Sequence, residues 1–348
     1  MKINFAASFN AATGYGNASV KMAKWLSSIG NDVCAIHDYG QKSAEEIQHL
    51  FKEPHKDART IAHCIPHDAK FDALWTISEF KPVPYSWKYA MDTCNTLMTQ
   101  SKFSKECLES VTNHPIEVVP NGIEIAFGLK KPAIQIPNFE VATKKPKVPT
   151  PFRFFSMFEW VPRKQGELLL RSFCEEFKPE DNAELWIRSW PAIGNPLKLI
   201  PWTTREYPKM RNNIFYIKNY VQDMQYIYQL FDSYVLPCAG EGFGLTFLEA
   251  MACGLKPIGP NHGGSLEFMT DKNSYLVECN DWEPVVPFGQ GMFAPDSKWR
   301  VPNKDALKKA MRTAYEKREK LTKGQSMEVK IQWSWEKAAR KMQKVLEK

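Results

Sequence analysis

The stretch GEGFGLTFLEAMACGLKPIGPNHGGSLE, residues 240–267, decides how the rest of the chain is interpreted. It follows the apolar run Tyr234–Pro237, which is typical of a buried parallel strand. Gly242 and Gly244 predict a tight turn whose backbone can approach a ligand closely. A helix is expected from about Leu245 to Ala252, and a glycine and a proline soon after it mark its end. Strand, turn and helix N-terminus together predict a phosphate site, because unpaired amides and the helix dipole point at such a ligand.

Two carboxylates frame this turn. Glu241 and Glu249 are eight residues apart, about two helical turns, which predicts that they project from roughly one side. Glu249 stands in an otherwise apolar row, where a charge is costly unless a partner such as a ribose diol hydrogen-bonds it. In the alternative interpretation, Glu249 is a solvated helix residue and Glu241 only complements the helix dipole. The glycines between and after the pair favour the first interpretation.

This pattern resembles the E-x7-E signature of retaining GT-B glycosyltransferases of the GT4 type (glycosyl transferases group 1). Glu241 and Glu249 lie within Glu-Gly-Phe-Gly-Leu and Glu-Ala-Met-Ala-Cys-Gly, and Gly263-Gly264 followed by Glu267 also fits that family. The resemblance implies an α/β protein of GT-B architecture, with two Rossmann-like domains that face an interdomain cleft.

The expected domains follow from this resemblance and from composition. Residues 130–151 contain five prolines and no strong periodicity, which is typical of a linker. We therefore expect an acceptor-side domain over 1–150 and a nucleotide-sugar-binding domain over 151–330. The resemblance implies that a C-terminal helix, 331–348, crosses back to the first domain.

Composition bounds the class of protein. The chain has 348 residues, of which 43% are apolar or aromatic, enough for two packed cores. No apolar run approaches the length of a membrane-spanning helix, so we expect neither a signal peptide nor a transmembrane segment. Its eight cysteines are scattered, which favours reduced thiols in a cytoplasmic protein, and no cluster has metal-ligand spacing. His63 and His67 are four apart, but Pro66 interrupts any helix there.

The formal net charge of +7 is concentrated at the C-terminus. Residues 304–348 hold 14 Lys/Arg against six Asp/Glu, a local balance of +8, so the remainder is close to neutral. This basic region could contact an anionic membrane surface or nucleic acid, or it could be a solvated helix face.

The N-terminal segment reads as a β-α-β unit. A strand over residues 2–8 leads through a turn at 13–17 into a helix, and a second strand follows at 32–36. Ser19 stands where a dinucleotide fingerprint would have its third glycine, so a nicotinamide enzyme is not indicated. The resemblance implies that Gly14, Tyr15 and Gly16 face the donor diphosphate.

Two further strands are expected near 59–64 and 71–78, and a proline-stiffened loop follows the second. Glu79 in this loop resembles a glutamate of one GT4 subgroup that is followed by a similar Pro and Trp, here Pro84 and Trp87. Glu79 and Trp87 are therefore acceptor candidates, with a surface-loop carboxylate as the alternative for Glu79. Residues 96–99 predict another strand, and Ser101 is expected to cap the helix that follows.

In the second half, Arg163 and Lys164 lie between a strand at 152–158 and a helix at 167–177. Two adjacent cations at such a turn suit a diphosphate, Arg as a planar fork and Lys as a point charge. Lys164 fits the family's second basic position. Met157-Phe158 stand where the family has its first arginine, and Arg163 is assigned to that role.

The remaining segments are assigned as follows. The excursion 189–211 interleaves aromatic and basic residues that could bind nucleic acid or a sugar, or could pack on the domain. The resemblance implies that Tyr220 and Val221 lie by the nucleotide base. Residues 274–277 are expected to form the last strand, 279–303 to be irregular, and 303–320 and 334–347 to be helices.

The sequence as a whole predicts a retaining glycosyltransferase, independent of metal and of any cofactor. The donor would be a nucleotide-diphospho-sugar, a UDP-sugar or a GDP-sugar. Arg163, Lys164 and the amides of Phe243 to Leu245 would neutralise the diphosphate, Glu249 would hold the ribose, and Glu241 would contact the donor sugar. The acceptor stays open between a glycan or lipid-linked sugar and a hydroxymethylated pyrimidine in DNA. A non-catalytic nucleotide-sugar-binding module is the alternative from another class.

Overall fold

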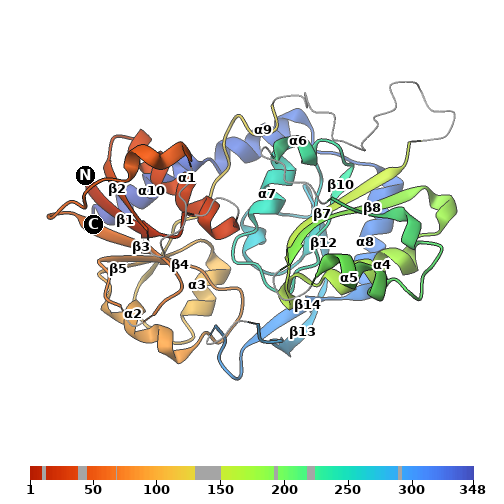
Figure 1. Cartoon of the computed structure of the whole chain (residues 1–348), viewed down its shortest axis with the longest axis horizontal. Coiled ribbons are helices and arrows are strands. Elements are labelled where there is room, and N and C mark those ends of the chain that lie inside the picture. Colours follow the sequence, from red (N-terminus) through yellow and green to blue (C-terminus); the bar gives the residue numbers. More distant parts are fainter. Residues whose placement is uncertain are drawn as a thin grey trace.

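The computed structural model describes residues 1–9, 13–37, 45–67, 69–129, 150–191, 195–217, 224–288 and 292–348. Figure 1 shows two lobes side by side, one built from the first third of the chain and the other from most of the rest. Both termini lie on the first lobe, because the last helix returns to it. The expected α/β architecture with two Rossmann-like lobes is confirmed.

The N-terminal lobe is built on a six-stranded parallel sheet in the order β2-β1-β3-β4-β5-β6. Its strands are β1 (Lys2–Ala7), β2 (Asp32–His37), β3 (Arg59–His63), β4 (Ala73–Thr76), β5 (Thr96–Thr99) and β6 (Ile116–Val118). Its helices are α1 (Gly14–Ser28), α2 (Lys88–Thr93) and α3 (Lys102–Leu108), with 3₁₀ turns at Glu45–Leu50 and Tyr85–Trp87. The strand order reverses between β1 and β3, and ligands of open parallel sheets bind at the carboxyl ends of such a strand pair.

The C-terminal lobe is built on a four-stranded parallel sheet in the order β10-β7-β8-β9. Its strands are β7 (Phe152–Trp160), β8 (Ala183–Pro191), β9 (Ile214–Tyr216) and β10 (Ser233–Tyr234). A parallel pair, β11 (Ile258–Pro260) and β12 (Tyr275–Val277), continues beside β10 through a bridge from Val235 to Ile258. Here the order reverses between β10 and β7, so the carboxyl ends of these two strands form the ligand-binding edge.

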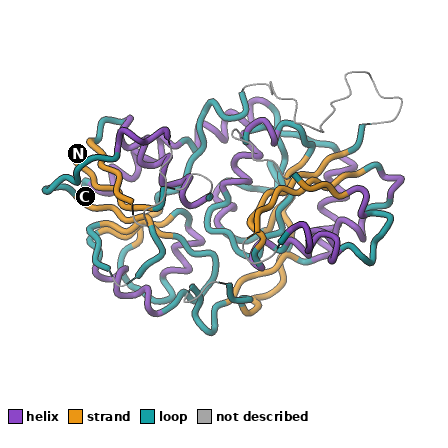
Figure 2. Tube along the Cα trace, in the orientation of Figure 1, coloured by secondary structure: helices purple, strands orange, loops and turns teal. Residues whose placement is uncertain are grey.

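The helices of the second half surround this sheet, except the last, which crosses to the N-terminal lobe (Figure 1 and Figure 2). They are α4 (Gly166–Glu176), α5 (Pro196–Thr203), α6 (Gln225–Tyr228), α7 (Leu245–Ala252), α8 (Lys304–Lys317), α9 (Lys323–Gln332) and α10 (Trp335–Leu346). Short 3₁₀ turns lie at Pro162–Lys164, Pro179–Asp181, Arg211–Asn213 and Gly264–Glu267.

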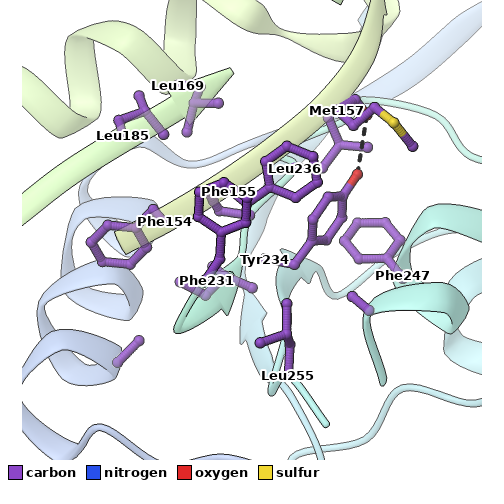
Figure 3. Close-up of a cluster of buried hydrophobic side chains, with 14 of the residues drawn as sticks. Phe154, Phe155, Met157, Leu169, Leu185, Phe231, Tyr234, Leu236, Phe247 and Leu255 are labelled. Carbon is purple, nitrogen blue, oxygen red and sulfur yellow. Dashed lines mark hydrogen bonds between the residues drawn. The ribbon is translucent and has the colours of Figure 1, made fainter. Parts of the chain in front are cut away.

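Aromatic side chains fill the core of the C-terminal lobe, between β7, β10 and α7 (Figure 3). The rings of Phe155 and Phe231 stack at 4.6 Å with an interplanar angle of 6°. The buried Tyr234 hydroxyl donates to the Met157 carbonyl at 3.1 Å, which satisfies the polar tip of an otherwise apolar ring. This packing fixes β10 against β7, and with it the relative position of the two loops that leave their carboxyl ends.

Three expectations for local structure are wrong. Residues 274–277 are not the last strand: β13 (Cys279–Pro284) and β14 (Lys298–Pro302) form an antiparallel pair in the segment expected to be irregular. Two C-terminal helices were expected, but a third, α9, precedes α10. The excursion 189–211, for which no element was expected, contains helix α5. A capping box between Thr322 and Gln325 opens α9.

The β13–β14 pair owes its structure to tertiary contacts. Lys298 bridges to Lys81 of the N-terminal lobe, and the Ser297 hydroxyl donates to the Pro82 carbonyl at 2.8 Å. Trp299, 1% exposed, belongs to the same buried cluster as Phe80. The two strands therefore pack across both lobes, which no local pattern in their own sequence reports.

The basic C-terminal region is divided between the lobes. Helix α8 packs on α4, where Lys304 pairs with Glu175 at 2.9 Å and Arg312 pairs with Glu176 at 2.7 Å. Helix α10 packs instead on α1 of the N-terminal lobe, within its buried cluster. The +8 charge of residues 304–348 is thus spread over three helices on two lobes and partly neutralised by acidic partners.

All eight cysteines are free thiols, and all but Cys253 are buried. Within the described ranges, no helix is both long and apolar enough to cross a membrane.

Candidate active site

The glycine turn before α7 lies where the two lobes touch. A side chain at Gly240 would place its Cβ 2.1 Å from the Glu79 carbonyl oxygen, and one at Gly242 would place it 2.2 Å from Ile77 Cγ1. Gly244 has a φ of +90°, a left-handed conformation that favours glycine. Helix α7 then begins at Leu245 and ends at Ala252, as predicted. The glycines are therefore required by close packing against the loop that follows β4.

Glu241 does not lie on this helix. Because α7 begins only at Leu245, the helical projection that put Glu241 and Glu249 on one side does not apply to Glu241. Its backbone is held by the Gly264 N–H, which donates to the Glu241 carbonyl at 2.6 Å.

Arg163 and Lys164 occupy the 3₁₀ turn that follows β7, at the carboxyl edge where the strand order reverses. The Lys164 ammonium lies 2.5 Å from Glu241 Oε2. The Arg163 guanidinium lies 3.1 Å from Glu79 Oε1 and 3.6 Å from Glu241 Oε2, and it also donates to the Gly240 carbonyl at 2.8 Å. Two cations and two carboxylates, predicted as separate site residues, thus form one charge network.

Burial and pairing shift the pKa values in this network in different directions. Burial would raise the pKa of Glu241, but the charges of Lys164 and Arg163 outweigh it and hold the pKa below its usual value. Burial raises the pKa of Glu79, and the Arg163 charge only partly opposes this effect. Burial would lower the pKa of Arg163, but the negative charges of Glu79 and Glu241 outweigh this effect and hold the pKa above its usual value. Glu241 is therefore the firmly ionised carboxylate of the pair.

Glu249 lies within α7, partly buried, where the Tyr228 hydroxyl donates to its Oε2 at 2.8 Å. Burial raises its pKa to about 7, despite the opposing hydrogen bond from Tyr228. A carboxyl group with this environment gains from further hydrogen-bond donors, such as the hydroxyls of a diol.

The amides at the head of α7 differ in what surrounds them. Phe243 is 1% exposed, with its ring 5.4 Å from that of Phe268, so its side chain is part of the core. The Leu245 side chain packs against the core clusters of both lobes. The Gly244 N–H forms a hydrogen bond that lowers the pKa of Glu241.

On the N-terminal lobe, Gly14, Tyr15 and Gly16 are the first turn of α1 rather than a loop before it. Thr13 caps this turn, its hydroxyl accepting from the Gly16 N–H at 3.0 Å. This helix end lies at the strand-order reversal between β1 and β3. The three residues are therefore at the edge of their sheet where a ligand would bind.

His63, at the end of β3, is a residue whose importance the sequence did not reveal. Its ring is fully buried and stacks between Tyr15, at 3.9 Å, and Trp75, at 4.2 Å. Its ring nitrogens lie 2.8 Å from the Ser19 hydroxyl and 3.0 Å from the Gln100 amide. Burial lowers its pKa to about 3, so the ring is neutral and supports the head of α1. In the sequence, only its position at the end of a predicted strand pointed to a role at the ligand-binding edge of the sheet.

The acceptor candidates differ. Glu79 joins the charge network, as described above. Trp87 is 4% exposed and packs within the N-terminal core beside Phe80, so its ring supports the loop and does not face a ligand, contrary to expectation. Tyr220 and Val221 lie outside the described residues.

Two contacts across the lobes were not predicted. The Ser101 hydroxyl caps α3, as expected, and also donates to the Gly242 carbonyl at 2.6 Å. Glu267 accepts from the Lys102 N–H at 2.7 Å. Both contacts hold the glycine-rich loops of the C-terminal lobe against the N-terminus of α3. No group of three or more residues suited to a metal ion occurs in the described part of the chain.

Comparison with known proteins locates this site within a recognised sequence pattern. Residues 152–286, which include both cations and both glutamates of the E-x7-E pattern, match the family model described as "Glycosyl transferases group 1". Sucrose synthase 1 of Hordeum vulgare is 36% identical over 77 residues, and sucrose synthase of Solanum tuberosum is 34% identical over 73 residues. These alignments span 22% and 21% of this chain but only 9% and 8% of the relatives' own lengths.

Solved structures match over the whole chain. HepE of Anabaena, in complex with UDP and glucose, has a TM-score of 0.70 at 12% identity and covers 100% of this chain and 99% of its own. Sucrose-phosphate synthase of Thermosynechococcus elongatus has a TM-score of 0.70 at 13% identity, with 100% and 98% covered. The chain is therefore a GT-B protein that resembles the glycosyl transferases group 1 family over residues 152–286.

Proposed function

We propose that the protein is a glycosyltransferase that moves a sugar from a nucleotide-diphospho-sugar to an acceptor hydroxyl. The observation that carries this proposal is the network of Arg163 and Lys164 with Glu241 in the glycine turn that leads into α7, the helix that holds Glu249. A UDP-sugar is favoured over a GDP-sugar as donor, because HepE, a structural neighbour, has been solved with UDP-glucose.

Each group has a role set by its chemistry. Arg163 and Lys164 neutralise the diphosphate together with the amides of Phe243, Gly244 and Leu245. Glu249 accepts hydrogen bonds from the ribose diol, and Glu241 from hydroxyls of the donor sugar. Gly14, Tyr15 and Gly16 approach the diphosphate from the other lobe.

The reaction is proposed to retain anomeric configuration by a front-face route. The bond from the sugar C1 to the phosphate oxygen breaks while a bond from C1 to the acceptor oxygen forms on the same face. The leaving phosphate takes up the acceptor proton. Arg163 and Lys164 stabilise the charge that develops on that phosphate, so turnover should not require a divalent cation.

The acceptor is proposed to be a hydroxyl of a glycan or lipid-linked sugar, with Glu79 nearest to it. Hydroxymethylated pyrimidine in DNA is the second acceptor to test. Docking through the basic region 304–348 has less support than its composition suggested, because α8 and α10 lie on different lobes and α8 is ion-paired.

The deciding experiment is a donor-hydrolysis screen with UDP-, GDP- and ADP-sugars, with and without chelator. Release of one nucleotide, undiminished by chelator and lost in Lys164→Ala, supports a metal-independent transferase and identifies its donor. Binding of a donor without any release, with or without acceptors, would instead support a nucleotide-sugar-binding module. Release that stops on chelation would contradict metal independence.

A further inference from the structure

The carboxylate of Glu241 is held by three groups at once. The Lys164 ammonium lies 2.5 Å away, the Arg163 guanidinium lies 3.6 Å away, and the Gly244 N–H donates a hydrogen bond from the residue that precedes α7. Two cations and a helix N-terminus form an anion site, whose preferred ligands are carboxylate and phosphate oxygens.

The same three groups are those that the proposed function assigns to the donor diphosphate. The Glu241 carboxylate occupies the position beside Lys164 and Arg163 where a phosphate oxygen would lie, although each cation has further N–H donors. Both ligands carry negative charge, so they also repel each other at this distance. The carboxylate therefore competes directly with the donor for one position.

We propose that Glu241 is an internal competitor for the phosphate position, and that the donor binds by displacing its carboxylate toward the sugar hydroxyls. Glu241, if the proposed function holds, then has two successive partners, first Lys164 and then the donor sugar. Glu241 then sets the donor affinity as well as the sugar contact.

The surroundings allow this exchange. The Glu241 backbone stays fixed by the Gly264 N–H, so only the side chain has to rotate. Arg163 keeps its contacts with Glu79 and with the Gly240 carbonyl when Glu241 leaves. Its buried Nε donates to no group in the described part of the chain.

The test measures binding of UDP and GDP, without sugar, by isothermal titration calorimetry to wild type, Glu241→Gln and Glu241→Asp. Glu241→Gln removes the carboxylate charge that competes with the nucleotide for Lys164, so it should lower the Kd for UDP or GDP by roughly tenfold. Glu241→Asp keeps the charge but is one methylene shorter, so it should also bind more tightly. Glu79→Gln is the matched control: it removes a carboxylate from Arg163 but leaves Glu241 on Lys164 and Gly244, and it should gain clearly less.

The nucleotide affinities of the three variants distinguish displacement of Glu241 from general charge repulsion. Gains in both Glu241 variants that exceed the gain in Glu79→Gln support displacement. Displacement would be contradicted by tighter binding in Glu241→Gln together with wild-type affinity in Glu241→Asp, or by an equal gain in Glu79→Gln, because both results indicate general charge repulsion. Unchanged or weaker nucleotide binding in both Glu241 variants would also contradict it. If neither wild type nor the variants bind either nucleotide while their thermal unfolding is normal, the proposed function itself fails.

Discussion

The carboxylate of Glu79 lies 3.1 Å from the guanidinium of Arg163, so a loop of the N-terminal lobe reaches a cation of the C-terminal lobe. Arg163 also donates to the Gly240 carbonyl at 2.8 Å. Its planar fork thus joins the loop after β4, the turn after β7 and the glycine turn before α7. Assembly of the site therefore depends on the relative position of the two lobes.

Replacement of Arg163 by Lys should lower donor turnover by about 100-fold, because an ammonium cannot reproduce several directed N–H contacts on a developing phosphate charge. The measurement is kcat/KM for donor hydrolysis, with thermal unfolding as the control for folding. Lys24→Arg, at an exposed ion pair on α1, is the matched change and should leave turnover unaltered. Wild-type turnover in Arg163→Lys would remove Arg163 from the phosphate site.

Glu249 should make stability fall as pH rises from about 4.5 to about 7. Its pKa is raised from 4.5 to about 7, so the native protein holds a proton that the unfolded chain has released within this window. The contribution is present below the unfolded pKa and is lost by pH 7, at most about 3 kcal/mol. Urea unfolding at pH 5 and pH 7.5 measures it, as the difference between wild type and Glu249→Gln. An equal pH dependence in both proteins would contradict the raised pKa.

His63 should act in the opposite direction. Its pKa is lowered from 6.5 to about 3, so the unfolded chain takes up a proton that the native ring does not. Its contribution to the free energy of unfolding should therefore be lost as pH falls from about 6.5 to 3. His63→Phe keeps the stack with Tyr15 and Trp75 but cannot be protonated, so it should flatten this acid limb. It should also lose stability at pH 7, because the hydrogen bonds of His63 with Ser19 and Gln100 are lost. Unfolding curves over pH 4–7.5 that remain parallel for the two proteins would disprove this.

Two glycine substitutions should have opposite effects. A Cβ at Gly264 would lie 1.9 Å from the Gly242 carbonyl oxygen, so Gly264→Ala must push two backbones apart, at a cost of about 1–3 kcal/mol or more. Gly324 lies in α9, where the nearest atom to a new Cβ is 3.8 Å away, so Gly324→Ala should stabilise the chain by roughly 0.5–1 kcal/mol. Denaturant unfolding of the two variants compares them, and donor turnover should fall only in Gly264→Ala. Equal stability of both variants would contradict the close approach of the two loops.

The local elements were predictable because their causes are local. Alternating or continuous apolar runs identified β1, β5 and β7, and the glycine turn gave the bounds of α7. Ser101 was recognisable as a cap because a hydroxyl just before a helix accepts a hydrogen bond from the backbone N–H two or three residues later. The β13–β14 pair was missed, since its apolar side chains have their partners on the other lobe.

The sequence by itself determined the glycine-rich turn and the residue types of the charge network, because these follow from short-range spacing and periodicity, and the GT-B architecture followed from the family resemblance that these residues carry. Only the tertiary structure decided which charges meet. Glu79 joins Arg163 from 84 positions away along the chain, Trp87 turns into a core, and His63 is enclosed between Tyr15 and Trp75. Such contacts depend on how two sheets and their loops pack, and packing is a property of surfaces distant in sequence. The engagement of Glu241 by Lys164, on which the donor-displacement proposal depends, belongs to this second group.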